Sequence, residues 1–168
     1  LKNSDLVSSK QYRRNVRIST RTLTMSKVIR KIVSCSKSPK PLAPYSQAIV
    51  ADRTVYCSGM IGIELNEPKL VPGGAAAQAA TALKHLTNLL REANSGIDKV
   101  VKTTVLLADM QDYAAVNEEY KKVFGSNFPA RTCYAVTKLP LGAAVEIEAI
   151  AIVGDVEHVG SVELGLKL

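Results

Sequence analysis

The stretch from Gly74 to about Asn94 constrains the fold more than any other part of the sequence. Its apolar residues recur at spacings of three and four, and they are Ala79, Ala82, Leu83, Leu86, Leu89, Leu90 and Ala93. This periodicity predicts an amphipathic helix with one buried stripe, and the sequence Asn-Ser-Gly that follows is typical of a helix C-terminus. One stripe needs one partner surface, so we expect the helix to lie on a sheet.

Strand-like segments lie on both sides of this helix. They are short, apolar and rich in β-branched residues, and they are expected at 28–33, 48–51, 54–63, 100–108 and, twice, within 127–153. Asp52 and Arg53 form a tight turn between the second and third of these, which predicts a hairpin. The run 100–108 is apolar almost throughout, as is typical of a central strand.

A second helix is expected between the N-cap Asp109 and Gly125. Helical spacing predicts its buried residues, which are Tyr113, Val116, Tyr120, Val123 and Phe124. The element order is then β, β, β, α, β, α, β, β, which indicates an α+β fold with two helices on one face of a mixed sheet. Nothing in the chain covers the other face. Residues 54–63 and 145–153 nevertheless have apolar side chains at both odd and even positions, so apolar side chains point to both faces of the sheet. We therefore expect that face to pack in a homo-oligomer.

Charge divides the chain into a tail and one domain. Of the formal charge of +7, residues 1–24 carry +5, so residues 25–168 carry only about +2. We expect 1–24 to be a disordered basic tail and 25–168 to be a single domain. The tail is rich in Ser, Thr and Arg and poor in acids, as transit peptides are. Translated upstream sequence and a functional basic arm remain alternatives.

The remaining composition favours a soluble intracellular protein. No apolar run is long enough to cross a bilayer, so no membrane partner is expected. Cys35, Cys57 and Cys133 are odd in number and far apart, which indicates neither a disulfide framework nor a zinc site. We expect a cytoplasmic location, or a mitochondrial one if the tail is a transit peptide. His85 and His158 are both expected to be solvated, and no metal site is predicted.

Three charged residues lie inside strands that are otherwise apolar, namely Arg131, Glu146 and Glu148. Such residues are costly to bury unless they are paired or have a function. Fifteen residues separate Arg131 from Glu146, which is enough for one strand, a turn and the start of a return strand. Antiparallel pairing would bring their side chains close, within one chain or across a subunit boundary. A plain Arg–Glu ion pair is the structural alternative.

Four segments, in order, resemble the signature blocks of the RidA/YjgF/UK114 family of reactive-intermediate imine and enamine deaminases. They are "PYSQAIVADRTVYCSGMIG", "VVKTTVLLADMQDYAAVNEEY", "NFPARTCYAV" and "VEIEAIAI", and the resemblance spans Met25 to about Gly154. It implies a chorismate-mutase-like α+β fold and a homotrimer with its sheets facing inward and active sites between subunits. It also implies hydrolysis of imino and enamino acids such as 2-aminoacrylate to 2-keto acids and ammonia, with no metal or organic cofactor.

The resemblance also assigns roles to two charged residues. Arg131, in "FPAR", matches the family arginine, whose planar fork suits a substrate carboxylate. Glu146, the first acid of "EIE", matches the glutamate that positions and deprotonates water.

Five further positions match family site residues. Tyr45 matches the tyrosine that closes the pocket, with loop packing as the alternative, and Ser58 and Gly59 match small residues that let a carboxylate approach. Asn117 matches a residue at the pocket mouth or is a surface residue. Cys133 lines the pocket and reacts with electrophiles, or is a buried inert thiol. Met60 stands where the family commonly has glutamine, so a polar contact from that side chain is not expected.

Two other function classes remain open. An RNA-cleaving translation inhibitor needs a basic surface with aromatic side chains, whereas residues 25–168 have little net charge and the chain has two Phe and no Trp. Nucleic acid is therefore not an expected partner. A ligand-binding or chaperone-like trimer with vestigial catalysis is the other alternative to an enzyme acting on small imino acids.

Overall fold

The structure is a computed structural model that describes residues 27–160. The prediction of a disordered tail at 1–24 lies outside the described residues and stays a prediction. The strands are β1 (Arg30–Val33), β2 (Ala48–Ala51), β3 (Thr54–Ile61), β4 (Val100–Leu107), β5 (Ala130–Ala135) and β6 (Val145–Ile152), and the helices are α1 (Gly74–Glu92) and α2 (Tyr113–Phe124). The predicted order of helices and strands is confirmed.

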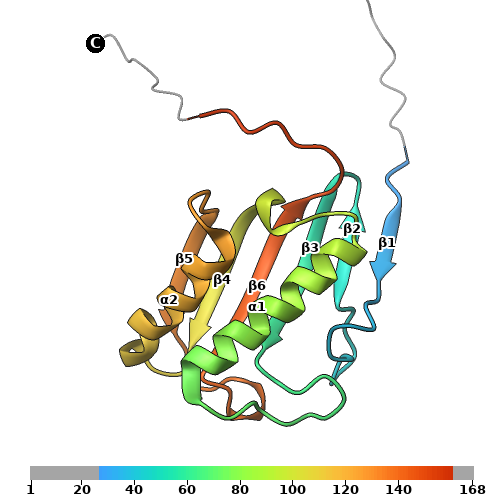
Figure 1. The fold of residues 1–168 in the computed structure, drawn as a ribbon. Coiled ribbons are helices and arrows are strands. Elements are labelled where there is room, and N and C mark those ends of the chain that lie inside the picture. Colours follow the sequence, from blue (N-terminus) through green and yellow to red (C-terminus); the bar gives the residue numbers. More distant parts are fainter. Residues whose placement is uncertain (1–26, 161–168) are drawn as a thin grey trace, which may run out of the picture.

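The strands form one mixed sheet in the order β1-β2-β3-β6-β4-β5. All neighbouring pairs are antiparallel except β4 and β5, which are parallel because α2 connects them as a crossover. Both helices lie on one face of the sheet (Figure 1). The α+β class and the position of both helices are therefore confirmed.

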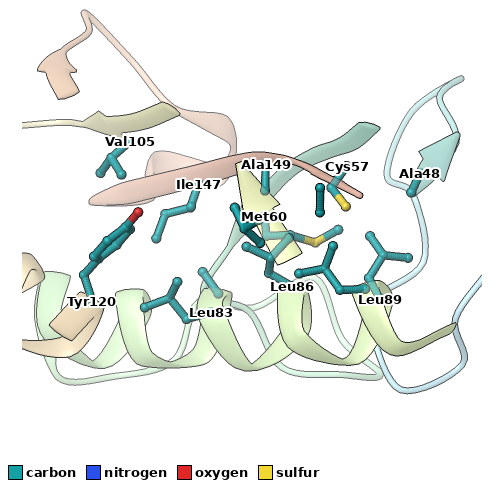
Figure 2. Close-up of a cluster of buried hydrophobic side chains, with 14 of the residues drawn as sticks. Ala48, Cys57, Met60, Leu83, Leu86, Leu89, Val105, Tyr120, Ile147 and Ala149 are labelled. Atoms are coloured by element: carbon teal, nitrogen blue, oxygen red, sulfur yellow. The ribbon is translucent and has the colours of Figure 1, made fainter. Parts of the chain in front are cut away.

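The core lies between α1 and the sheet. Leu83, Leu86 and Leu89 point from α1 towards Ile147 and Met60 of the sheet, as Figure 2 shows, and the three leucines are fully buried. The whole predicted stripe is buried, since only Ala93 among its members retains a measurable exposed fraction, of 6%. The helix ends as the sequence indicates, because Asn94 adopts a left-handed conformation with φ 58° and Ser95 N donates to Leu90 O.

The second helix begins with the predicted cap. The carboxylate of Asp109 accepts a hydrogen bond from Gln111 N at 2.8 Å, and a 3₁₀ turn over Met110–Asp112 leads into α2. Val116, Tyr120 and Phe124 are buried as predicted. Tyr113 is not, since 38% of it is exposed. It starts the helix near the edge strand β5, where the sheet no longer covers it.

The prediction that His85 is solvated is wrong, because only 6% of its surface is exposed. Its position on α1 faces the loop that follows β3, and its Nε2 lies 2.8 Å from the carbonyl oxygen of Ile63. Helical periodicity treats histidine as polar, so it could not reveal a loop that returns to cover this side. His158 is exposed, as predicted.

Residues 27–160 leave the second face of the sheet without cover. A row of side chains crosses it from Ile32 through Ile49 and Tyr56 to Ile150, each opposite the next in the strand register. Ile32 is 64% exposed and Tyr56 is 49% exposed. We name this surface the open face. The sequence-based expectation of an uncovered, partly apolar face is confirmed for the described residues.

Candidate active site

Glu146 projects from the centre of the sheet towards the open face. Its neighbours Val145 and Ile147 are fully buried against the helices, and side chains alternate along a strand. Glu146 is paired with Ile61 of β3 and with Leu106 of β4, so its backbone is held on both sides. A carboxylate in this position is rigidly placed and half-buried.

A β-bulge in β3 makes room for this carboxylate. The register of β3 against β6 shifts between Cys57 and Met60, which places Ser58 and Gly59 beside Glu146. A Cβ at Gly59 would overlap the Oε1 of Glu146. Gly59 therefore leaves room for the carboxylate of Glu146, and its role in letting a ligand approach stays a prediction.

A cavity of about 340 Å³ opens in front of Glu146, and we name it the Glu146 pocket. Ser58, Gly59 and Tyr45, which the sequence predicts as site residues, all line it together with Glu146. Most of the remaining lining is apolar and includes Pro39, Leu42, Ala43, Met60, Ile61, Ile63 and Pro140. The structure thus brings four of the predicted site residues to one place.

The rim of this pocket is held by a residue that sequence reasoning missed, Gln47. It is 4% exposed, its Oε1 accepts from Cys35 N at 2.7 Å, and its Nε2 donates to the carbonyl oxygens of Cys35, Ser38 and Pro39. Ser58 adds two bonds, from its N to Gln47 O and from its Oγ to Ser46 O. A glutamine two residues after Tyr45, at the end of a Pro-rich loop, was the available signal.

The pKa of the Glu146 carboxyl lies above its ordinary value. Burial is the main cause because it disfavours the charged form, and the neighbouring carboxylate of Glu148 adds repulsion in the same direction. A carboxylate with a raised pKa is a stronger base than an ordinary one. It is suited to taking a proton from water.

Arg131 lies in a second cluster, built by α2. Its Nη1 donates to Asn117 Oδ1 at 2.8 Å and its Nη2 donates to Tyr113 Oη at 3.1 Å. Its Cζ lies 4.8 Å from the centre of the Tyr120 ring. A hollow of about 280 Å³ adjoins it, and we name this the Arg131 hollow, which is lined by Asn117, Tyr120, Lys121, Phe128, Pro129 and Arg131.

Arg131 makes no ion pair within residues 27–160, where the ion pairs are Lys121–Glu118 and Lys122–Glu119. The alternative of an intrachain Arg–Glu pair is therefore wrong. The charge of Arg131 is available to an anionic ligand.

Cys133 lies two residues beyond Arg131 on the same side of β5 and packs against the edge of the core. Burial raises the pKa of its thiol, and Arg131 opposes this shift only in part. Burial likewise raises the pKa of Cys57 to about 12. Because the thiolate is the nucleophile, neither thiol is activated at neutral pH.

The Glu146 pocket and the Arg131 hollow are separated by the sheet. The expectation that the two strands pair antiparallel is wrong, because β4 lies between β5 and β6. Arg131 is paired with Thr103, and Glu146 is paired with Leu106 of the same strand. Positions three apart on one strand point to opposite faces and lie roughly 10 Å apart along it. One chain therefore cannot bring both side chains to one small molecule.

Among residues 27–160 there is no group of three His, Cys, Asp or Glu side chains that could hold a metal ion. No helix in that range is long and apolar enough to span a membrane. The chemistry available at the two clusters is that of an arginine, a basic carboxylate and aromatic side chains.

Comparison with known proteins decides the family. Residues 35–153 match the family model described as endoribonuclease L-PSP. The chain belongs to this family, the RidA/YjgF group that its motifs resemble. It is 55% identical over 133 residues to the RutC family protein UK114 of Drosophila melanogaster, covering 79% of this chain and 96% of that protein. It is 51% identical over 130 residues to the human 2-iminobutanoate/2-iminopropanoate deaminase, covering 77% of this chain and 95% of that protein.

The fold is also that of solved members. The crystal structure of Escherichia coli TdcF with bound serine superposes with a TM-score of 0.70 at 30% identity, covering 74% of this chain and 99% of that one. The family expected from the four motifs is thus confirmed by both sequence and structure. The roles of the individual site residues stay predictions.

Proposed function

We propose that this protein hydrolyses 2-imino acids and their enamine tautomers to 2-keto acids and ammonia. The observation that carries the proposal is an arginine that has no anionic partner within residues 27–160, together with a half-buried carboxylate whose pKa is raised. The first suits the carboxylate of the substrate, and the second suits the activation of water. Relatives about half identical in sequence are named for this reaction.

The reaction can be written with the residues of this chain. Arg131 holds the carboxylate next to the C=N carbon. Glu146 takes a proton from water as the water oxygen bonds to that carbon, and the protonated Glu146 gives this proton to the nitrogen. The hydroxyl proton of the tetrahedral amino alcohol then moves to its nitrogen, and the C=O bond forms as the C–N bond breaks and ammonia leaves. An enamine first gains a proton at carbon to become the imine.

We further propose a homotrimer in which the Arg131 hollow of one subunit faces the Glu146 pocket of the next. Three observations support assembly. The two clusters lie on opposite faces of one sheet, the open face carries the apolar row from Ile32 to Ile150, and the Glu146 pocket opens towards that face. The threefold symmetry rests on the family resemblance. Closed assembly would bring together two half-sites that one chain keeps apart.

A coupled assay tests the chemistry. An amino-acid oxidase or dehydratase generates the imine, and formation of keto acid is followed with and without the protein. Arg131→Ala and Arg131→Lys should abolish the acceleration and keto-acid binding, since a point charge cannot replace the planar fork. Glu146→Gln should retain much of the binding and lose the rate by roughly 10²-fold or more.

Matched surface changes on α1, Arg91→Ala and Glu92→Gln, remove the same charges from exposed positions and should keep the wild-type rate. A fully active Glu146→Gln combined with an inactive Cys133→Ala would show nucleophilic chemistry instead and contradict the assignment.

RNA cleavage is the second candidate, because the description of the matched family names an endoribonuclease. Incubation of the wild type with single-stranded RNA tests it directly. Cleavage without any acceleration of imine hydrolysis would favour this function. Keto-acid binding without either activity would favour a ligand-binding or chaperone-like trimer.

A further inference from the structure

We propose that Tyr113 and Tyr120 are positioning residues that fix the guanidinium of Arg131 in one orientation without neutralising its charge. The inference rests on the proposed function, since it explains how Arg131 is prepared to receive a carboxylate. Helical spacing alone assigns both tyrosines to the buried side of α2. Their contacts with Arg131 indicate a second role.

Tyr120 is a fixed platform. It is 3% exposed, and its ring stacks on Phe124 with centroids 4.2 Å apart and on Phe128 with centroids 6.5 Å apart. Its Oη lies 2.8 Å from the Oγ1 of Thr103, which is fully buried, and Figure 2 shows the hydroxyl directed towards the sheet. Thr103 is the strand partner of Arg131. The Tyr120 hydroxyl is thus bonded to Thr103, and Thr103 pairs with Arg131, the residue that the Tyr120 ring supports.

The guanidinium of Arg131 rests against this platform and is held at its edge. Its Cζ lies 4.8 Å from the Tyr120 centroid and 5.6 Å from the Tyr113 centroid, both within the range of cation–π attraction. One N–H of each terminal nitrogen is used, by Asn117 and by Tyr113. The remaining N–H groups of Arg131 have no partner in the part of the chain that the structure describes, which leaves them for a ligand.

The chemical nature of these contacts explains why the positive charge of Arg131 is not neutralised. An aspartate or glutamate in the place of Tyr113 would orient Arg131 equally well, but it would compete with the substrate carboxylate. Aromatic rings, a phenol and an amide attract a cation without carrying a net charge. A ligand carboxylate therefore meets a fork that is already ordered and still fully charged, which lowers the entropic cost of binding.

Tyr113 offers the cleaner test because it is partly exposed at the start of α2. Tyr113→Phe removes the hydroxyl that accepts from Arg131 and keeps the ring, and Tyr113→Leu removes both. On the assembled protein we expect the pyruvate Kd, measured by titration calorimetry, to rise roughly 3- to 10-fold for the first and further for the second. The KM for imine should rise in parallel while kcat stays within about twofold, because Arg131 holds ground and transition states alike.

Tyr120 tests the platform itself. Tyr120→Phe keeps the ring over Arg131 and should retain most of the pyruvate affinity, whereas Tyr120→Leu should lose roughly 10-fold. If Tyr120→Leu fails to fold, the two variants Tyr113→Phe and Tyr113→Leu test the inference by themselves. Lys122→Gln, an exposed change on the same helix, is the control and should leave Kd and KM unchanged.

A spectrum of ¹⁵N-arginine-labelled protein reports the orientation directly. Resolved Nη signals of Arg131 are expected in the wild type, and they should merge in Tyr113→Leu as the group becomes free to rotate. Unchanged pyruvate Kd in both Tyr113 variants, or a fall in kcat at constant KM, would overturn the inference. A wild type that binds no pyruvate would overturn it too. Pyruvate binding needs no turnover. If pyruvate binding weakened in the tyrosine variants but the wild type showed no deamination, the proposed function would be contradicted and this inference would be supported.

Discussion

Glu146 and Glu148 are neighbours on the same face of β6, two residues apart. Burial and then the charge of Glu148 raise the pKa of Glu146, so its basic form exists only above a pH higher than that of an ordinary carboxyl. We expect kcat/KM to fall as the pH is lowered through this raised pKa. Glu148→Gln removes the repulsion and should move the acid limb to lower pH, which a pH profile of kcat/KM measures.

The sign of this shift separates repulsion from other effects of the substitution. Loss of a proton donor or a structural defect at Glu148 would lower the rate at all pH values without moving the limb. Glu92→Gln, on the exposed side of α1, removes an equal charge far from the site and should leave the profile in place. A limb that moves to higher pH in Glu148→Gln would contradict the role given to that carboxylate.

At the scale of elements, the loop between β1 and β2 is ordered mainly by Gln47. Gln47→Ala leaves the buried Cys35 N–H and the carbonyl oxygens of Ser38 and Pro39 without this partner, and it leaves the carbonyl oxygen of Cys35 with Ser38 N as its remaining donor. We expect the free energy of unfolding to fall by about 1–3 kcal/mol, as for other buried groups left unsatisfied. Amide exchange at Cys35 and Ser38 should also become faster, because the loop that carries Tyr45 loses its anchor.

Gln111→Ala is the matched control for this change, since Gln111 is an exposed glutamine on the turn before α2. Its effect should stay within about 0.5 kcal/mol, the usual scale for surface positions. Urea unfolding at fixed protein concentration measures both variants. If exchange at Cys35 were unaltered in Gln47→Ala, the loop would be held by something other than this side chain.

At the scale of the whole molecule, the separation of Arg131 from Glu146 makes the proposed trimer testable by mixing subunits. An Arg131→Ala subunit keeps Glu146, and a Glu146→Gln subunit keeps Arg131. Unfolding and refolding an equal mixture should restore roughly a quarter of the wild-type rate, because about one interface in four then joins two intact halves. The same coupled assay measures it.

Each variant alone, carried through the same refolding, is the control and should stay inactive. Light scattering should give the mass of three chains for the wild type and for both variants. A monomer mass at micromolar concentration would count against assembly, and a mixture no more active than its components would show that both residues do not serve one shared site.

Local sequence was sufficient wherever a structure depends on neighbours in the chain. The stripe from Ala79 to Ala93, the cap at Asp109 and the Asp52–Arg53 turn could be predicted because periodicity and turn chemistry act over a few residues. The same holds for the mixed α+β architecture, since it follows from the order of the elements. The motifs around Tyr45, Arg131 and Glu146 identified the family because residue types at fixed spacing can be read from the sequence without knowledge of the fold.

Strand order, in contrast, was decided only by tertiary structure. Arg131 and Glu146 lie on strands that follow each other in sequence, yet β4 is inserted between them and the register turns their side chains to opposite faces. The burial of His85 and the exposure of Tyr113 depend in the same way on which distant segment covers each helix. These contacts join segments that lie far apart in the chain, so no local pattern encodes them. The sequence by itself identified the family and the residues expected to carry the chemistry, and the sheet determined that a single chain keeps Arg131 and Glu146 apart.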